Sequence, residues 1–257
     1  MNTFTLKMIA LFFMLIDHIG YYFQGTPLLF RIIGRGAYPL FLFCMVWGYH
    51  YTKNRSMYLL RLYLMGIFMA VFRYFIDIFF VAGFGYGNHN IFVPLLLVGI
   101  FISAFEQFEK NVQKGFLILG GLFIIQLLVF ILPSLFPSLL LFHDELRTAF
   151  LPNLFINEYG FEFIALGVLM YFLKEKKELF CAMYLSFCLY QFSKEFSSFG
   201  GIIQTFMVFA LPFMMYYNRE KGPGMKYFFY FMYPAHTFLF FYLANFTSLP
   251  HIFFVSS

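Results

Sequence analysis

Long apolar stretches alternate with short polar ones along almost the whole chain. A helix needs about 20 mostly apolar residues to cross a bilayer. Stretches of that kind lie at 4–23, 35–52, 57–82, 89–107, 115–136, 154–173, 179–196, 200–217 and 226–246. The pattern therefore predicts an all-α integral membrane protein with about nine transmembrane helices, built as a single domain over residues 1–257.

The number of transmembrane helices could differ from nine by one or two because of one region. Residues 131–157 hold Pro133, Pro137 and Pro152 together with the polar run 143–145. Proline interrupts helical hydrogen bonding, and a charged run is costly inside a bilayer. We expect a loop here that carries a re-entrant or surface helix.

The composition excludes a soluble domain. The chain of 257 residues is 62% hydrophobic and 11% charged, whereas soluble chains are about half apolar and about a quarter charged. The solvent for most of its exterior must then be lipid. The net charge of +5 does not indicate nucleic-acid binding, because the positions of the basic residues explain it, and the three cysteines show no metal-ligand spacing.

Lysine and arginine mark one side of the membrane. Twelve of the 17 basic residues lie at alternate helix ends: Lys7, Lys53, Arg55, Arg61, Lys110, Lys114, Lys174, Lys176, Lys177, Arg219, Lys221 and Lys226. The opposite ends, at 24–26, 83–87 and 197–201, carry no basic residue. Cytoplasmic loops are enriched in lysine and arginine. We therefore expect a cytoplasmic N-terminus and an uncleaved first span.

The first span carries the clearest candidate chemistry. Lys7 and His18 are 11 residues apart, which is three helical turns with about 20° left over, so both point the same way about 16 Å apart along the axis. Histidine is suited to proton transfer near neutral pH. The alternative is a lysine that reaches the membrane surface and a histidine that only bonds a neighbouring helix.

Charged residues near the outer side need partners, because charge inside a bilayer is costly. Asp17 lies about 100° around the helix from His18, so we expect it to pair with Arg31 or Arg35 on another helix. Arg31 and Arg35 share a helix face through their i,i+4 spacing. That face suits an anion, a carboxylate or a carbonyl oxygen, and the alternative is anchoring to lipid headgroups.

Three further sites are candidates on spacing or depth. Arg73 and Asp77 are spaced i,i+4 and are expected to form a structural ion pair within one helix. His236 falls near the middle of the last span, next to Pro234, which allows a local kink. Glu158 opens the sixth span, where a structural role and a functional one are equally open.

Several segments, in order along nearly the whole chain, carry specific motifs: 7–10 with 14–20, 31–41, 51–62, 90–92, 158–160 and 227–236. Together they resemble the signature of the TraX family, and more widely that of membrane acyltransferases of the acyltransferase-3 type. Glu158 stands where the family pattern has an aspartate, which keeps the carboxylate.

The resemblance implies an acetyl-CoA-dependent membrane acyltransferase in the cytoplasmic membrane of a bacterial cell. It would pass an acetyl-type group from cytoplasmic acyl-CoA to an outer acceptor, either a pilin N-terminus linked to conjugation or a cell-envelope glycan. It implies that His18 and Asp17 are catalytic. It also implies that substrate is bound by Lys7, Arg31, Arg35, Glu158, Tyr233 and His236.

Two other functions remain open on the sequence. Membrane-depth histidine, aspartate and arginine also suit the proton or anion pathway of a transporter or channel. A non-catalytic scaffold is the other possibility, favoured if His18 and His236 face lipid. No metal is expected in any of these three cases.

Overall fold

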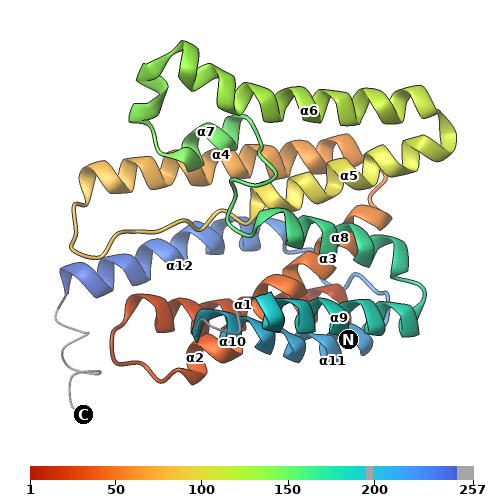
Figure 1. Cartoon of the computed structure of the whole chain (residues 1–257). Coiled ribbons are helices and arrows are strands. Elements are labelled where there is room, and N and C mark those ends of the chain that lie inside the picture. Colours follow the sequence, from red (N-terminus) through yellow and green to blue (C-terminus); the bar gives the residue numbers. More distant parts are fainter. Residues whose placement is uncertain (195–198, 248–257) are drawn as a thin grey trace. The chain divides into compact units, whose positions relative to one another are not determined.

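The computed structural model describes residues 1–194 and 199–247, and every secondary-structure element in these ranges is a helix. This confirms the all-α class. The chain forms two compact units (Figure 1). Unit 1 comprises Met1–Trp47, Ala82–Tyr86 and Phe172–Ser257, and unit 2 comprises Gly48–Val81 and Gly87–Tyr171. The single domain over 1–257 stays a prediction.

Unit 1 is built from both ends of the sequence. Its helices are α1 (Thr3–Tyr22), α2 (Leu29–Gly34), most of α3 (Ala37–Tyr51), α9 (Lys177–Lys194), α10 (Phe199–Thr205), the short 3-10 helix η2 (Phe206–Phe209), α11 (Ala210–Met215) and α12 (Lys226–Phe246). Helix α1 packs against both α2 and α12. The N-terminal helix is therefore held by the C-terminal one.

Unit 2 is continuous in sequence apart from residues 82–86. It contains α4 (Arg55–Phe79), α5 (Phe92–Lys110), α6 (Val112–Leu135), the 3-10 helix η1 (Pro137–Leu141), α7 (Asp144–Phe150) and most of α8 (Gly160–Leu173). Helix α5 packs against α4 and α6, and α7 packs against α4. Short connections make α5 and α6 antiparallel neighbours.

Asparagine begins three of the long helices. The Oδ1 atoms of Asn2, Asn54 and Asn111 accept hydrogen bonds from the backbone N–H groups three residues further on. Such a cap satisfies a backbone donor that has no partner inside the helix. Asn111 also ends α5, so one residue separates two helices that would otherwise read as one apolar stretch.

Within the described residues, five of the expected spans are long and apolar enough to cross a membrane. They are Thr3–Tyr22, Leu29–Tyr51, Arg55–Phe79, Phe92–Lys110 and Val112–Leu135. The other four expected spans correspond to α8, to the interrupted helix Ile202–Met215, and to α9 and α12. As far as the structure describes them, these four do not meet that criterion. The total of nine and the cytoplasmic N-terminus stay predictions.

Helix α6 exposes most of its apolar side chains, which indicates that lipid surrounds the protein. It is the most apolar of these helices, yet only Gly115, Leu122 and Val129 are buried in it. Apolar side chains such as Phe116 and Leu117 are exposed along it. An exposed apolar surface of this length is stable only against lipid or another apolar partner.

The proline-rich region is a chain of short elements, as expected for 131–157. Pro133 lies inside the last turns of α6, Pro137 begins η1, and α7 follows. Its helices are five and seven residues long. Neither is long enough to cross a bilayer.

Candidate functional site

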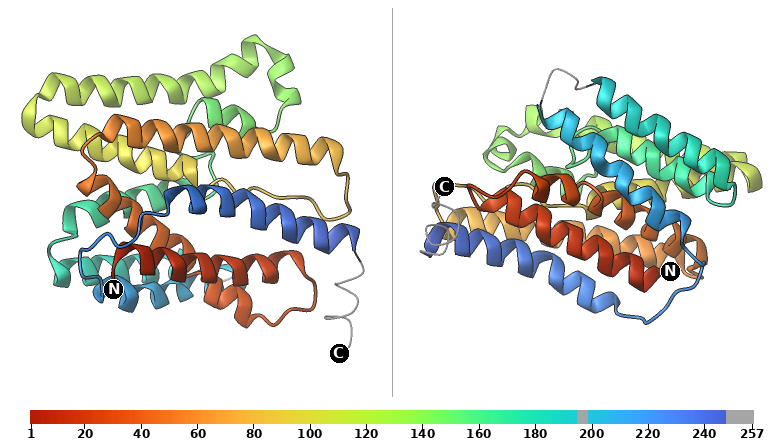
Figure 2. Two further views of the ribbon diagram at one scale, coloured as in Figure 1. Left: turned by 180° about the vertical axis from the view of Figure 1, so that it is seen from behind. Right: turned by 90° about the horizontal axis from the view of Figure 1, so that it is seen from below.

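Two buried histidines from opposite ends of the sequence meet in unit 1. Helices α1 and α12 lie side by side (Figure 2). Phe4 contacts Phe229 near their first turns, whereas Tyr22 contacts Phe241 near their last, so the helices are parallel. Between these contacts, His18 Nδ1 lies 2.9 Å from His236 Nε2.

The environment of this pair assigns its protons. His18 and His236 are only 8% and 3% exposed. His236 Nδ1 lies 2.7 Å from the carbonyl oxygen of Met232, which can only accept, so Nδ1 carries the hydrogen. When the His236 ring is neutral, its Nε2 has no hydrogen and accepts a hydrogen bond. His18 Nδ1 must then be the donor. The basic nitrogen of the pair is therefore His18 Nε2.

Tyr233 stands one turn before His236 on α12 and is buried. Its ring packs edge-on against the His236 imidazole, with 5.7 Å between the ring centroids. Pro234 follows it and lies inside the helix without ending it. Tyr233 thus packs against the histidine pair, and its expected part in substrate binding stays a prediction.

Asp17 joins α1 to α2 through two ion pairs. Its Oδ2 lies 2.8 Å from Arg31 Nη1, and its Oδ1 pairs with the Arg35 guanidinium. The expectation that Asp17 pairs with Arg31 or Arg35 is confirmed, and it pairs with both. Arg35 Nη1 also donates to Gln204 Oε1 at 3.3 Å. One carboxylate therefore holds two guanidinium groups, and this cluster lies next to His18 in sequence.

Lys7 lies on the same face of α1 as His18. Its ammonium group is 5.5 Å from the centre of the Phe229 ring on α12, the helix that also contributes His236. The shared face expected from the spacing is confirmed. At this end of unit 1, Thr3 N donates to the Glu220 carbonyl, so Arg219 and Lys221 lie near the start of α1.

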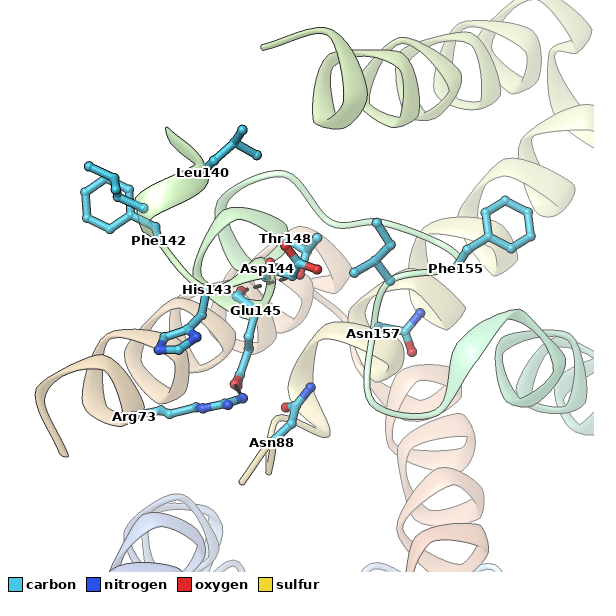
Figure 3. A pocket seen from close by; sticks show the side chains of 12 residues that line it. Arg73, Asn88, Leu140, Phe142, His143, Asp144, Glu145, Thr148, Phe155 and Asn157 are labelled. Carbon is cyan, nitrogen blue, oxygen red and sulfur yellow. Dashed lines mark hydrogen bonds and ion pairs between the residues drawn. The ribbon is translucent and has the colours of Figure 1, made fainter. Parts of the chain in front are cut away.

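The remaining candidates lie in unit 2. Arg73 Nε is 3.3 Å from Asp77 Oδ2, which confirms the expected ion pair within α4. Arg73 Nη1 also contacts Glu145 Oε2 at 2.5 Å, and Figure 3 shows the two side chains meeting. Glu158 lies half-buried in the segment before α8. It belongs to the other unit from His18.

Sequence reasoning missed two contributors. Gly34 lets the Asp17 carboxylate pack against α2, and nothing in the local pattern indicated that contact. Glu145 was visible as part of the polar run at 143–145, but its pairing with Arg73 needs the packing of α7 on α4. Within the described residues, no group of three or more histidine, cysteine, aspartate or glutamate side chains is placed to hold a metal ion.

Comparison with known proteins agrees with the motifs. A family model described as TraX protein matches residues 3–141, which is more than half of the 257 residues. No curated protein matches the chain. No solved structure matches it either. The matched stretch contains His18, Asp17, Arg31 and Arg35, and it ends before His236. The chain belongs to the TraX family.

Proposed function

We propose that this chain is an integral membrane acyltransferase of the cytoplasmic membrane. It passes an acetyl-type group from acyl-CoA on the cytoplasmic side to an acceptor on the outer side. The observation that carries this proposal is the buried contact of His18 with His236. A basic imidazole nitrogen held at a defined position is what general base catalysis requires.

His18 acts as the base and His236 positions it. His236 donates a hydrogen bond to the Met232 carbonyl and accepts one from His18 Nδ1. Because the hydrogen of the neutral His18 ring is on Nδ1, the lone pair is on Nε2. A fixed tautomer keeps that nitrogen ready to accept a proton. His236 also supports the imidazolium that forms, because a histidine that accepts a hydrogen bond stabilises the charged donor.

The reaction is a direct transfer in this proposal. An acceptor amine or hydroxyl attacks the thioester carbonyl, and His18 Nε2 takes its proton. The carbon–sulfur bond then breaks, and the leaving thiolate of CoA receives that proton. A guanidinium N–H group of Arg31 or Arg35, which Asp17 holds in place, stabilises the oxyanion formed on the way.

The donor enters from the end of unit 1 where the basic residues gather. Lys7 stands on the face of α1 that carries His18, with Arg219 and Lys221 close to the same helix end. The phosphates of acyl-CoA bind there. The rise of about 16 Å from Lys7 to His18 matches an extended thioester arm between the two.

Two acceptors suit this chemistry, a pilin N-terminus and a cell-envelope glycan. The first supplies an amine and the second a hydroxyl. Both present a proton that His18 can remove.

Replacing the base tests the proposal. We expect His18→Ala to lower transfer of radiolabelled acetyl from acetyl-CoA to membrane material by about 10²- to 10⁴-fold, the usual contribution of a general base. His50→Ala serves as the matched control and should keep the wild-type rate. Equal rates for His18→Ala and the wild type, at equal amounts of folded protein, would remove the mechanism.

Lys7 tests where the donor binds. We expect Lys7→Ala to weaken binding of a non-hydrolysable acetyl-CoA analogue to the purified protein, because one phosphate contact is lost. Lys114→Ala, in unit 2, should leave that affinity unchanged. If Lys7→Ala binds the analogue as tightly as the wild type, the CoA end is placed wrongly.

The same binding experiment separates the alternative function. A histidine pair beside an aspartate–arginine cluster also suits a proton or anion pathway through a transporter or channel. A transporter of that kind has no need to bind acyl-CoA. Proton flux in liposomes without any binding of the analogue would favour this alternative.

A further inference from the structure

A polar cavity in unit 2 has no role in the proposed acyl transfer. It has a volume of about 780 Å³, within the range of about 300–1,000 Å³ typical of small-ligand sites. It lies where α4, the connection before α5 and the segment around α7 meet (Figure 3). Arg73 places it near the end of α4 that the charge pattern assigns to the outer side.

The charged side chains around this cavity are already paired with one another. Arg73 binds Asp77 and Glu145, and Arg147 binds Asp144. His143 Nε2 lies 3.6 Å from Asp77 Oδ2. Three carboxylates thus face two guanidinium groups and one imidazole.

This pairing disfavours an ionic ligand. A ligand with a full charge would have to separate a partly buried ion pair to gain a partner, and leaving a buried charge without its partner is expensive. Burial raises the pKa of Glu145 above its ordinary value, although the hydrogen bond from Arg73 and the charge of Arg73 act in the opposite direction. Because Arg73 Nη1 contacts Glu145 Oε2, a cationic ligand would have to compete with Arg73 for this carboxylate.

The groups left for a ligand are an uncharged amide, a carboxylate that is already paired with Arg147, and apolar rings. The Asn88 side chain is exposed and lines the cavity, so it offers both an amide donor and a carbonyl acceptor. The second carboxylate oxygen of Asp144, itself largely exposed, can accept. Phe142 and Phe155 also line the cavity, and their exposed rings supply apolar surface.

We propose that this cavity binds a neutral, hydroxyl-rich ligand, namely an uncharged sugar residue. A sugar hydroxyl donates and accepts at the same atom, which fits a wall of mixed donors and acceptors. The apolar face of a sugar ring fits the phenylalanine rings. The cavity lies in unit 2, and its occupation by a sugar does not depend on acyl transfer at His18.

The test uses the full-length purified chain in a detergent without a sugar headgroup, because a maltoside would compete. The neutral probes are glucose, N-acetylglucosamine and maltose. Glucuronate and glucosamine are the charged probes for comparison, because they carry a negative and a positive charge on the same pyranose ring as glucose. Ligand-observed NMR measures binding, and titration gives the dissociation constants.

We expect at least one neutral sugar to bind more tightly than either charged sugar. Asn88→Leu should weaken that binding about five- to tenfold, as loss of hydrogen bonds to one amide does. Gln113→Leu is the matched control, because it removes an exposed amide in the first turn of α6, at the helix end away from η1 and α7. It should leave the affinity unchanged.

A second variant tests the charge balance. Glu145→Gln removes one of the three carboxylates, and we expect it to raise the affinity for glucuronate relative to the neutral sugars. The proposal is overturned if no neutral sugar binds, if a charged sugar binds best to the wild type, or if Asn88→Leu and Gln113→Leu weaken binding alike. None of these outcomes bears on His18→Ala.

Discussion

Gly34 shows how closely α1 and α2 approach at the candidate site. A Cβ atom added at this position would lie 2.2 Å from Asp17 Cβ. That atom is next to the backbone of α1, so it cannot move aside as the tip of a long side chain could. The absence of a side chain at Gly34 is therefore what allows Asp17 to reach Arg31 and Arg35 together.

We expect Gly34→Ala to lower the melting temperature of the purified protein. Overfilling a packed contact costs about 1–3 kcal/mol, which corresponds to a loss of about 2 °C or more for a chain of this size. Gly120→Ala is the matched control, because a Cβ there meets no atom within 4 Å. If both variants melt at the same temperature, the contact does not constrain the two helices.

At the scale of helices, Glu106 holds three elements of unit 2 together. Its carboxylate on α5 pairs with Arg55 at the start of α4 and accepts a hydrogen bond of 2.5 Å from the Tyr171 hydroxyl on α8. Arg55 also lies 4.8 Å from the centre of the Tyr49 ring on α3. A hydrogen bond to a charged group contributes more than one between neutral groups.

Removing the Tyr171 hydroxyl should therefore destabilise the contact between α4, α5 and α8. We expect Tyr171→Phe to reduce the free energy of unfolding by about 1.5–3 kcal/mol, measured by denaturant titration in detergent. The same change at the exposed Tyr216 should cost nothing measurable. The double variant Tyr171→Phe with Glu106→Gln should lose less free energy of unfolding than the sum of the two single variants, because both changes break the same interaction. Additive losses of this free energy would argue against the junction.

At the scale of the whole molecule, the basic residues predict which side each connection faces. The turn between α5 and α6 lies between Lys110 and Lys114, whereas the connection between α4 and α5 contains no lysine or arginine. The rule that positive loops stay inside predicts that the first connection is cytoplasmic and that the second lies on the outer side.

Cysteine labelling tests this orientation. In a chain whose three native cysteines are replaced by serine, we expect Gly85→Cys to react with a membrane-impermeant maleimide in spheroplasts. Gln113→Cys should react only after permeabilisation. Both positions are exposed, and a side chain at Gly85 meets no atom within 4 Å, so access is set by the membrane alone. The reverse pattern would invert the orientation.

The sequence by itself determined the class of the protein, because lipid exposure is a matter of composition and of the length of apolar stretches. It also determined the shared face of Lys7 and His18, since helical periodicity is local. The pairing of Asp17 was predictable in kind, because a charge in a membrane segment needs a partner.

Only the tertiary structure decided which residues meet across the chain. His18 and His236 are separated by 218 positions, and no local pattern fixes the distance between their rings. Glu145 and Gly34 matter only once two helices pack against each other. Local rules act over a few residues along one helix, whereas a site of this kind depends on contacts between helices far apart in sequence.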